Sequence, residues 1–326
     1  NRLTLDWSEA SVVKPLSPGV HVVDDVSVGD LVEYIDWTPF FQAWEVPGKY
    51  PHILDHPKSG AEASRLFAEA RTMLDQMIEE EWLKPVGVCG VFPASSHGDD
   101  IVLFEDDDRS ARLAVLHTLR QQTVKAKGKP NRALADFVAP MDTGVQDYVG
   151  AFAVTAGHGV AERAAQFEES HDDYNAIMLK ILADRLAEAF AELMHKWVRT
   201  KIWGYAPDEV SSAEDLVRER YRGIRPAPGY PAQPDHTEKL TIWKLLDAER
   251  ATGITLTESL AMYPASSVAG IYFAHPEADY FNVGQLGKDQ VRDYAARKGM
   301  EVEDVERWLG SRLNYEPIKK GIVAVE

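Results

Sequence analysis

The chain has 326 residues, of which 35 are Lys or Arg and 52 are Asp or Glu, so its net charge is −17. With 45% hydrophobic residues, the composition is that of a folded globular protein. The acidic balance disfavours nucleic acid and anionic membrane surfaces as primary partners, because phosphate binding depends on clustered Lys and Arg. No apolar run approaches the roughly 20 residues that are needed to span a bilayer.

Cysteine usage points to a reducing compartment. Cys89 is the only cysteine, which excludes an internal disulfide and a multi-cysteine zinc or iron–sulfur site. The chain begins at Asn1, without an initiator Met and without the shape of a signal peptide. We therefore expect a cytoplasmic protein, and we expect this chain to be a fragment of a longer one.

The predicted elements begin with an extended arm over residues 1–30, in a region that is rich in Pro, Asp, Gly and Trp and has little periodicity. Apolar residues at helical spacing then predict helices at 59–82, 171–200, 213–221, 237–249 and 288–309, the last broken at Gly299. Short apolar runs between turn residues predict strands at 86–92, 101–104, 112–116, 135–139, 148–155, 266–273 and 280–285.

The order of these elements indicates the fold class. The helices are grouped around runs of strands instead of alternating with them, which favours an α+β fold with an antiparallel sheet. No internal repeat, coiled coil or low-complexity tract interrupts the chain. One continuous domain over residues 1–326 is the simplest organisation.

Several common catalytic and binding motifs are missing. The chain has no P-loop, H-E-x-x-H zinc motif or G-x-S-x-G nucleophile elbow, and Glu162 replaces the third glycine of a dinucleotide loop at 157–162. The acidic run at 168–173 fits the start of a helix better than a metal site, because negative charge is favourable at the positive end of the helix dipole. We therefore predict neither catalytic side chains nor metal ligands.

The most informative segment is Arg-Pro-Ala-Pro-Gly-Tyr-Pro at 225–231. Its prolines stiffen a loop, and Gly229 removes a side chain where another group can approach the backbone. Arg225 can hold a carboxylate through two parallel hydrogen bonds. The plain alternative is a stiff connection whose arginine pairs with a nearby helix. Asp235 and Glu238 resemble a capping box, which predicts a helix start just after them.

This segment, together with Pro-Asp-His-Thr-Glu-Lys at 234–239, resembles the C-terminal activation domain of cobalamin-dependent methionine synthase. Further segments that resemble the same family cover most of the chain and lie at 34–41, 134–140, 171–175, 183–192, 203–207 and 291–309. The resemblance implies a bent antiparallel sheet flanked by helices that binds S-adenosylmethionine. It also implies that cobalamin is held mainly by another module, and that zinc belongs only to modules outside this chain.

The resemblance also implies roles for residues at both ends of the ligand's amino-acid group. Arg225 matches a family position that holds the carboxylate, and Asp36 matches a position at the cationic end. Glu188 matches a family position near the ligand. From the residues alone, a turn or cap residue before Pro39 is the better explanation of Asp36, and a solvated helix face is the better explanation of Glu188.

The remaining implied contacts concern the nucleoside and the loop. Tyr280 and Phe281 match a position beside the nucleoside, where the family has two tyrosines, so Phe281 can contribute stacking or backbone contacts but no hydroxyl. An aromatic pair that opens a core strand is the alternative. Ala227 and Gly229 are expected to contact the ligand through their backbone, and Tyr230 through its ring or hydroxyl.

The implied function is to present the methyl group of S-adenosylmethionine to cob(II)alamin for reductive methylation, which reactivates a methyltransferase of methionine biosynthesis. The implied partners are the cobalamin-binding module and a flavodoxin-like electron donor, and the chain alone should have little activity. The domain's expected part is to position the methyl donor. The alternative is a non-catalytic docking domain for the electron donor and the cobalamin module.

Overall fold

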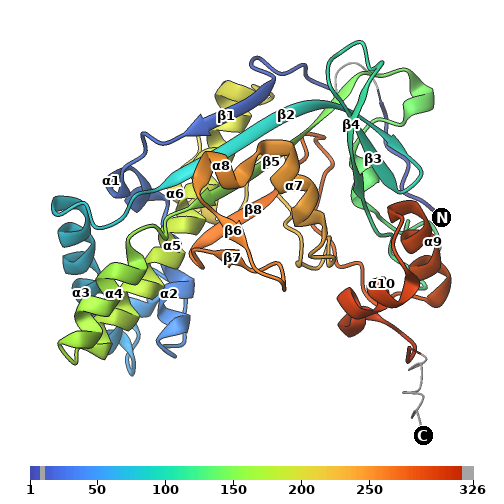
Figure 1. The fold of residues 1–326 in the computed structure, drawn as a ribbon. Helices are drawn as coiled ribbons and strands as arrows, with labels where there is room; N and C mark the ends of the chain where they lie inside the picture. The colour runs from blue at the N-terminus through green and yellow to red at the C-terminus, as the bar shows by residue number, and fades with distance from the viewer. Residues whose placement is uncertain (8–11, 318–326) are drawn as a thin grey trace, which may run out of the picture.

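A computed structural model of the chain describes residues 1–7 and 12–317. Its main feature is a six-stranded antiparallel sheet of order β4-β3-β2-β5-β8, in which β1 also pairs with β2 (Figure 1). The strands are β1 Gly19–Val23, β2 Val86–His97, β3 Asp100–Phe104, β4 Arg112–His117, β5 Asp147–Thr155 and β8 Ser267–Tyr272. A separate hairpin pairs β6 Thr255–Leu256 with β7 Met262–Tyr263.

The long strand β2 holds the sheet together. One of its edges pairs with β1 over residues 87–91 and with β3 over residues 94–97, while the other pairs with β5 over residues 86–94. Every residue of β2 except the last is buried. A strand that is covered on both faces has no polar side, which explains why the sequence of β2 is continuously apolar from Val86 to Ala94 instead of alternating.

Long helices cover one face of the sheet. Cys89, Phe152 and Val154 point from the sheet into the core on the side of α5 Asp173–Trp197. Three further helices, α2 Trp37–Ala43, α3 Gly60–Glu79 and α4 Val160–Glu169, gather with α5 at one end of the molecule (Figure 1). Each fully buried Leu or Phe side chain in this layer contributes about 1.5–3 kcal/mol.

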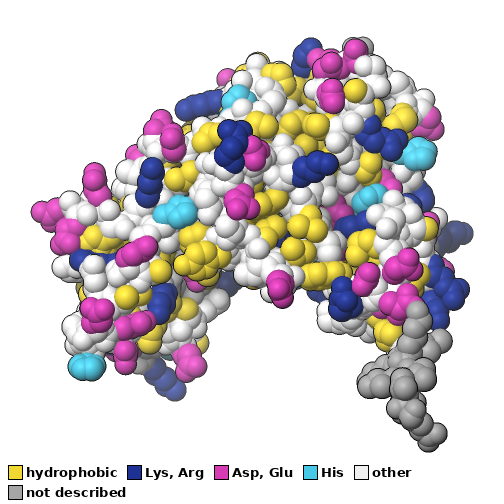
Figure 2. All heavy atoms as spheres, viewed as in Figure 1, with side chains coloured by type: hydrophobic (Ala, Val, Ile, Leu, Met, Phe, Trp, Pro, Cys, Tyr) yellow, Lys and Arg dark blue, Asp and Glu magenta, His cyan; other side chains and the backbone are white. Residues whose placement is uncertain are grey.

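The opposite face packs on shorter helices. Val88, Ala151 and Ala153, which alternate with the residues of the first face, contact α7 Glu238–Leu246 and α8 Ala248–Thr252. At the other end of the molecule, α9 Lys288–Lys298 and α10 Val302–Trp308 form a third core around Leu119 and Tyr294. Figure 2 shows the resulting arch, with hydrophobic side chains over the middle of the visible face.

The remaining elements are short. They are α1 Val28–Leu31, α6 Ala213–Val217, a π-turn at Val198–Ile202 and 3₁₀ turns at Val32–Tyr34, His52–Asp55, Leu134–Phe137, Met141–Thr143 and Gly310–Arg312. Among the described residues, no helix is long and apolar enough to cross a membrane.

The predicted α+β class with an antiparallel sheet and flanking helices is confirmed, and two predicted strands are wrong. Residues 135–139 instead contain the 3₁₀ turn Leu134–Phe137, because the Asp136 carboxylate accepts hydrogen bonds from Ala133 N at 2.8 Å and from Arg120. Residues 280–285 form a loop. The predicted arm at 1–30 is extended only in part, since it contains β1 and α1, and its residues 8–11 lie outside the described residues.

Candidate functional site

The proline-rich loop lies along the outer edge of β8. Ile224 and Phe273 exchange backbone hydrogen bonds at 3.1 and 3.0 Å, and Ile271 N donates to Pro226 O at 2.9 Å. Gly270 makes this approach possible, because a Cβ there would stand 2.9 Å from Pro226 O. The loop therefore extends the sheet by a few residues before it turns away. This pairing fixes the position of the Arg225 backbone, because the residues on either side of it are bonded to the sheet edge.

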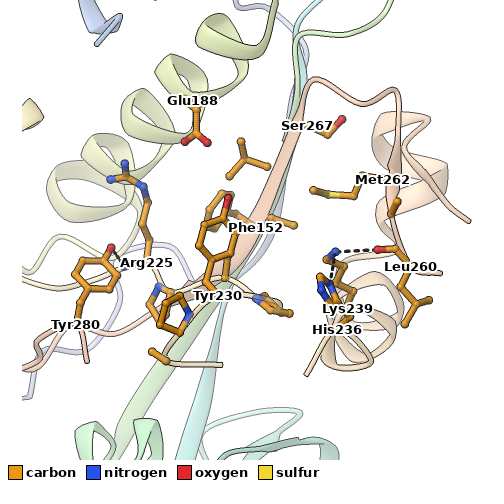
Figure 3. A pocket seen from close by; sticks show the side chains of 18 of the residues that line it. Phe152, Glu188, Arg225, Tyr230, His236, Lys239, Leu260, Met262, Ser267 and Tyr280 are labelled. Carbon is orange, nitrogen blue, oxygen red and sulfur yellow. Dashed lines mark hydrogen bonds between the residues drawn. The ribbon is translucent and has the colours of Figure 1, made fainter. Parts of the chain in front are cut away.

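A cleft of about 960 Å³ opens between this loop, β8, the β6–β7 hairpin and α5. Glu188 and Arg225 lie on one side, His236 and Lys239 on the other, and Tyr230 stands between them (Figure 3). Much of the remaining lining is apolar and comes from Phe152, Pro226, Ala227, Pro228, Leu260, Ala261, Met262, Val268, Ala269 and Phe281. The cleft thus has charged groups around an apolar surface that suits a flat ring.

Six of the eight predicted site residues line this cleft: Glu188, Arg225, Ala227, Tyr230, Tyr280 and Phe281. Asp36 lies instead in a neighbouring cavity of about 280 Å³, which shares Glu188, Glu219 and Arg225 with the cleft. Gly229 lines neither cavity. The structure therefore brings Glu188 on α5 together with Phe281, which lies far along the chain beyond β8.

Arg225 is held by an internal ion pair. Its Nη1 donates to Glu192 Oε2 at 2.6 Å and to the Tyr221 hydroxyl at 2.6 Å, and its backbone N–H donates to the Tyr280 hydroxyl at 3.0 Å. Burial lowers the pKa of the guanidinium, but the negative charge of Glu192 outweighs this and raises it well above its ordinary value. Nη1 therefore makes the contact that the plain alternative predicts, a pair with a nearby helix, because Glu192 lies on α5.

Asp36 caps a helix. It is the N-cap of α2, and its Oδ1 accepts a hydrogen bond from Thr38 N at 2.9 Å. The cap interpretation is thus confirmed, and the second carboxylate oxygen is engaged by no hydrogen bond within the described part of the chain. Because Asp36 lines the small cavity beside Arg225 and Glu188, a contact with a cationic ligand group stays a prediction.

Comparison with known proteins places the chain in a family. The family model described as the activation domain of vitamin B12 dependent methionine synthase matches residues 27–299. The chain belongs to this family. A solved structure of the MetH reactivation domain bound to AdoHcy is 54% identical, covers 97% of this chain and 97% of its own, and superposes with a TM-score of 0.94. The family is part of a methyltransferase, methionine synthase.

Local structure explains why position 229 of this activation domain is a glycine. Its φ of +97° lies in the left-handed region, and a Cβ would stand 2.3 Å from Cε1 and 2.7 Å from Nδ1 of the His236 ring. The group that approaches this backbone is therefore His236, and a ligand contact of Gly229 stays a prediction. Tyr230 follows with 61% of its surface exposed, and burial together with Glu188 raises its pKa.

Tyr280 and Phe281 do not open a strand. Val283 N donates to Pro231 O at 2.9 Å, and Gln121 Nε2 donates to Asn282 O at 2.7 Å, so this segment binds to two other loops instead of to the sheet. Phe281 packs against Phe137 with its ring tilted by 58° and ring centroids 6.3 Å apart, while it lines the cleft. It therefore serves the core and the cleft together.

The predicted capping box is wrong. The N-cap of α7 is Thr237 and makes no side-chain cap hydrogen bond, while the Glu238 carboxylate accepts from His117 N at 3.1 Å and pairs with Lys298. Asp235 accepts from Thr237 N at 2.8 Å and from Lys298 Nζ at 2.8 Å. The two carboxylates thus join the turn to α9, and they do not close the end of the helix.

Sequence reasoning missed the far wall of the cleft. Lys239 Nζ donates to Leu260 O at 2.8 Å and contacts His236 Nδ1 at 3.2 Å, which ties α7 to the β6–β7 hairpin (Figure 3). Burial lowers the pKa of Lys239 and is also the largest cause of the lowered pKa of His236. Both residues lie in the segment 234–239 that carries the resemblance. Their spacing of three places them on one side of a helical turn, and this spacing is the signal that could have indicated that they line the cleft together.

Proposed function

We propose that the cleft binds S-adenosylmethionine and presents its methyl group to cobalamin for reductive methylation, as the reactivation module of methionine synthase. The observation that carries the proposal is the arrangement of Arg225, Glu188 and Tyr280 around one apolar cleft of about 960 Å³. A solved relative at 54% identity has AdoHcy bound, and this ligand differs from S-adenosylmethionine by the methyl group and its charge.

The cleft offers a fitting group for each part of the ligand. The guanidinium of Arg225 suits the carboxylate, because planar bidentate pairing is geometrically specific. Glu188, with Asp36 in the adjoining cavity, supplies negative charge for the ammonium and sulfonium groups. The ring of Tyr280, with Phe281 and the prolines of the loop, provides a flat apolar surface for the adenine.

The chain's part in the reaction is orientation. Transfer of a methyl group from a sulfonium requires no proton to be removed from the donor, so the residues of the cleft need only hold the sulfonium with its methyl group directed outward. Cobalamin, held mainly by another module of the enzyme, supplies the cobalt that accepts the methyl group. A flavodoxin-like protein is the proposed source of the electron.

Titration calorimetry with S-adenosylmethionine tests the binding step. We expect a saturable one-to-one isotherm, and we expect Arg225→Ala to weaken binding by about ten- to a hundredfold, because a charge-assisted hydrogen bond contributes about 1.5–3 kcal/mol. Arg250→Ala is the matched control, since Arg250 is an exposed arginine on α8 outside the cleft. An unchanged affinity of the Arg225 variant would contradict the assigned role.

Glu188→Gln gives a second test that does not disturb an internal ion pair, since no ion pair of Glu188 occurs within the described residues. If Glu188 faces the sulfonium, the variant binds S-adenosylmethionine about tenfold more weakly, while its affinity for the uncharged thioether AdoHcy changes by less than threefold. Equal losses for the two ligands would place Glu188 elsewhere. The absence of any binding by the wild-type chain would refute the proposed function itself.

A further inference from the structure

The guanidinium of Arg225 is fixed at one corner. Three groups converge on Nη1: Glu192 Oε2 at 2.6 Å, the Tyr221 hydroxyl at 2.6 Å and His195 Nδ1 at 3.4 Å. Within the described part of the chain, no hydrogen bond engages Nε or Nη2. The edge that carries these two nitrogens is the one that a carboxylate can approach with two parallel hydrogen bonds.

The groups around Nη1 are themselves fixed. The Tyr221 hydroxyl lies 3.1 Å from Glu192 Oε2, so the tyrosine accepts from the arginine and donates to the glutamate. His195 is fully buried and stacks on Tyr272 with ring centroids 4.9 Å apart. Burial, and after it the charges of Arg199 and Arg225, lower the pKa of His195 well below its usual value, so the ring is neutral and Nδ1 can accept a hydrogen bond from Arg225.

Glu192 is held from the other side by a second arginine. Arg199, which is fully buried in the π-turn Val198–Ile202, pairs with both oxygens of Glu209 at 2.7 and 2.8 Å, and its Nη2 stands 3.5 Å from Glu192 Oε1. The guanidinium of Arg199 also lies 3.8 Å from the centre of the Tyr221 ring. The charges alternate along the series Glu209, Arg199, Glu192 and Arg225, so a ligand carboxylate on Arg225 would continue the alternation.

We infer that Glu192, assisted by Tyr221, is a positioning residue that fixes Nη1 of Arg225 and thereby makes the cleft selective for sulfonium nucleosides that carry a carboxylate. The inference rests on the proposed function. A guanidinium that is already held loses less side-chain freedom when the ligand binds, and it presents its free edge in one direction. Glu192 also lines the small cavity, but its two oxygens face Arg225 and Arg199, so the part assigned to it is to hold Arg225.

The test compares S-adenosylmethionine with its decarboxylated analogue, which keeps the nucleoside, sulfonium and amine but has no carboxylate. Calorimetry on Glu192→Gln should show at least a tenfold loss of affinity for S-adenosylmethionine and less than a twofold change for the analogue. Tyr221→Phe keeps the ring over Arg199 and removes only the hydroxyl, and it should show the same selectivity with a smaller loss. Glu209→Gln is the matched control. Like Glu192→Gln it removes a negative charge that pairs with Arg199, but Glu209 is not bonded to Arg225.

The outcomes separate the possibilities. Equal losses for the two ligands in Glu192→Gln, or selective losses of the same size in Glu209→Gln, would mean a general structural effect and would overturn the inference. An unchanged affinity in Glu192→Gln would do so as well. If the wild-type chain binds neither ligand, the proposed function fails and the inference fails with it. Should Glu192→Gln not fold, the selectivity of Tyr221→Phe decides.

Discussion

Replacing Gly229 by alanine tests the most constrained point of the proline-rich loop. The residue has a φ of +97°, and the new Cβ would stand 2.3 Å from His236 Cε1 and 2.9 Å from Nε2, well inside van der Waals contact. The ring cannot move freely, because Nδ1 contacts Lys239 Nζ at 3.2 Å and this amine is bound to Leu260 O. Relief of the clash must therefore shift the wall of the cleft.

The expected cost has two parts. The left-handed backbone costs about 1–2 kcal/mol for any residue with a Cβ, and forcing an extra methyl group into a packed site costs about 1–3 kcal/mol. Gly128 separates them, because its φ is +84° and a Cβ there would meet nothing within 4 Å. We expect Gly128→Ala to lower the free energy of unfolding by about 1–2 kcal/mol and Gly229→Ala by about 2–5 kcal/mol.

Urea unfolding at constant slope measures both variants, with the shift in midpoint giving the difference in the free energy of unfolding. Because His236 lines the cleft, Gly229→Ala should also weaken S-adenosylmethionine binding several-fold, while Gly128→Ala leaves it unchanged. Equal destabilisation by the two substitutions would refute the reasoning, since it would show that His236 gives way at no cost.

Three further predictions concern buried groups. Burial raises the pKa of Asp147 to about 6, so its contribution to stability is present at acid pH and is lost as the pH rises from 4 to 6. At about 1.36 kcal/mol per unit of pKa, the loss is about 3 kcal/mol, and the difference in unfolding free energy between wild type and Asp147→Asn should follow this slope. Lys298→Ala leaves the carboxylates of Asp235 and Glu238 buried without their cation, so it should cost about 3–5 kcal/mol near pH 7 and less near pH 4, where they can be protonated. Burial also raises the pKa of Cys89 to about 12, so a thiol reagent should label it only at the rate at which the protein unfolds.

Each of these predictions has an outcome that would contradict it. A difference between wild type and Asp147→Asn that does not vary between pH 4 and 6 would mean that Asp147 is accessible to water. A cost of Lys298→Ala that is the same at pH 4 and pH 7 would mean that lost packing, and not unpaired charge, destabilises the variant. Rapid labelling of Cys89 under native conditions would contradict its burial beneath α5.

The sequence predicted the long elements with a buried face well, whereas the shorter helices α2 and α4 were not predicted. The helix predicted at 59–82 is α3 Gly60–Glu79, and the strand predicted at 148–155 is β5, because long apolar patterns have few other solutions. The strands predicted at 135–139 and 280–285 are wrong for a common reason. Their aromatic residues pack on the core from loops, which are held by Asp136 with Arg120 and by Asn282 with Gln121. Such pairs are distant in sequence and leave no periodic signal.

The residues around the cleft could be predicted from the sequence, but the hydrogen bonds and ion pairs between them could not. Family motifs indicated which side chains would surround the cleft, and six of eight do. They did not indicate that Glu192 would reach Arg225, because a glutamate at that position reads as an ordinary helix residue. Its role depends on how α5 lies against the segment 219–225, and this is set by the tertiary packing of Tyr221 and His195.

The pairing of the proline-rich loop with β8 also concerns the solubility of the protein. Phe273 and Ile271 would otherwise present unbonded N–H groups at the rim of an apolar sheet, where a second polypeptide could attach as an additional strand. Ile224 and Pro226 occupy these donors, and the proline has no N–H with which to continue the ladder outward. Substitutions that loosen this loop are therefore expected to promote aggregation as well as to disturb ligand binding.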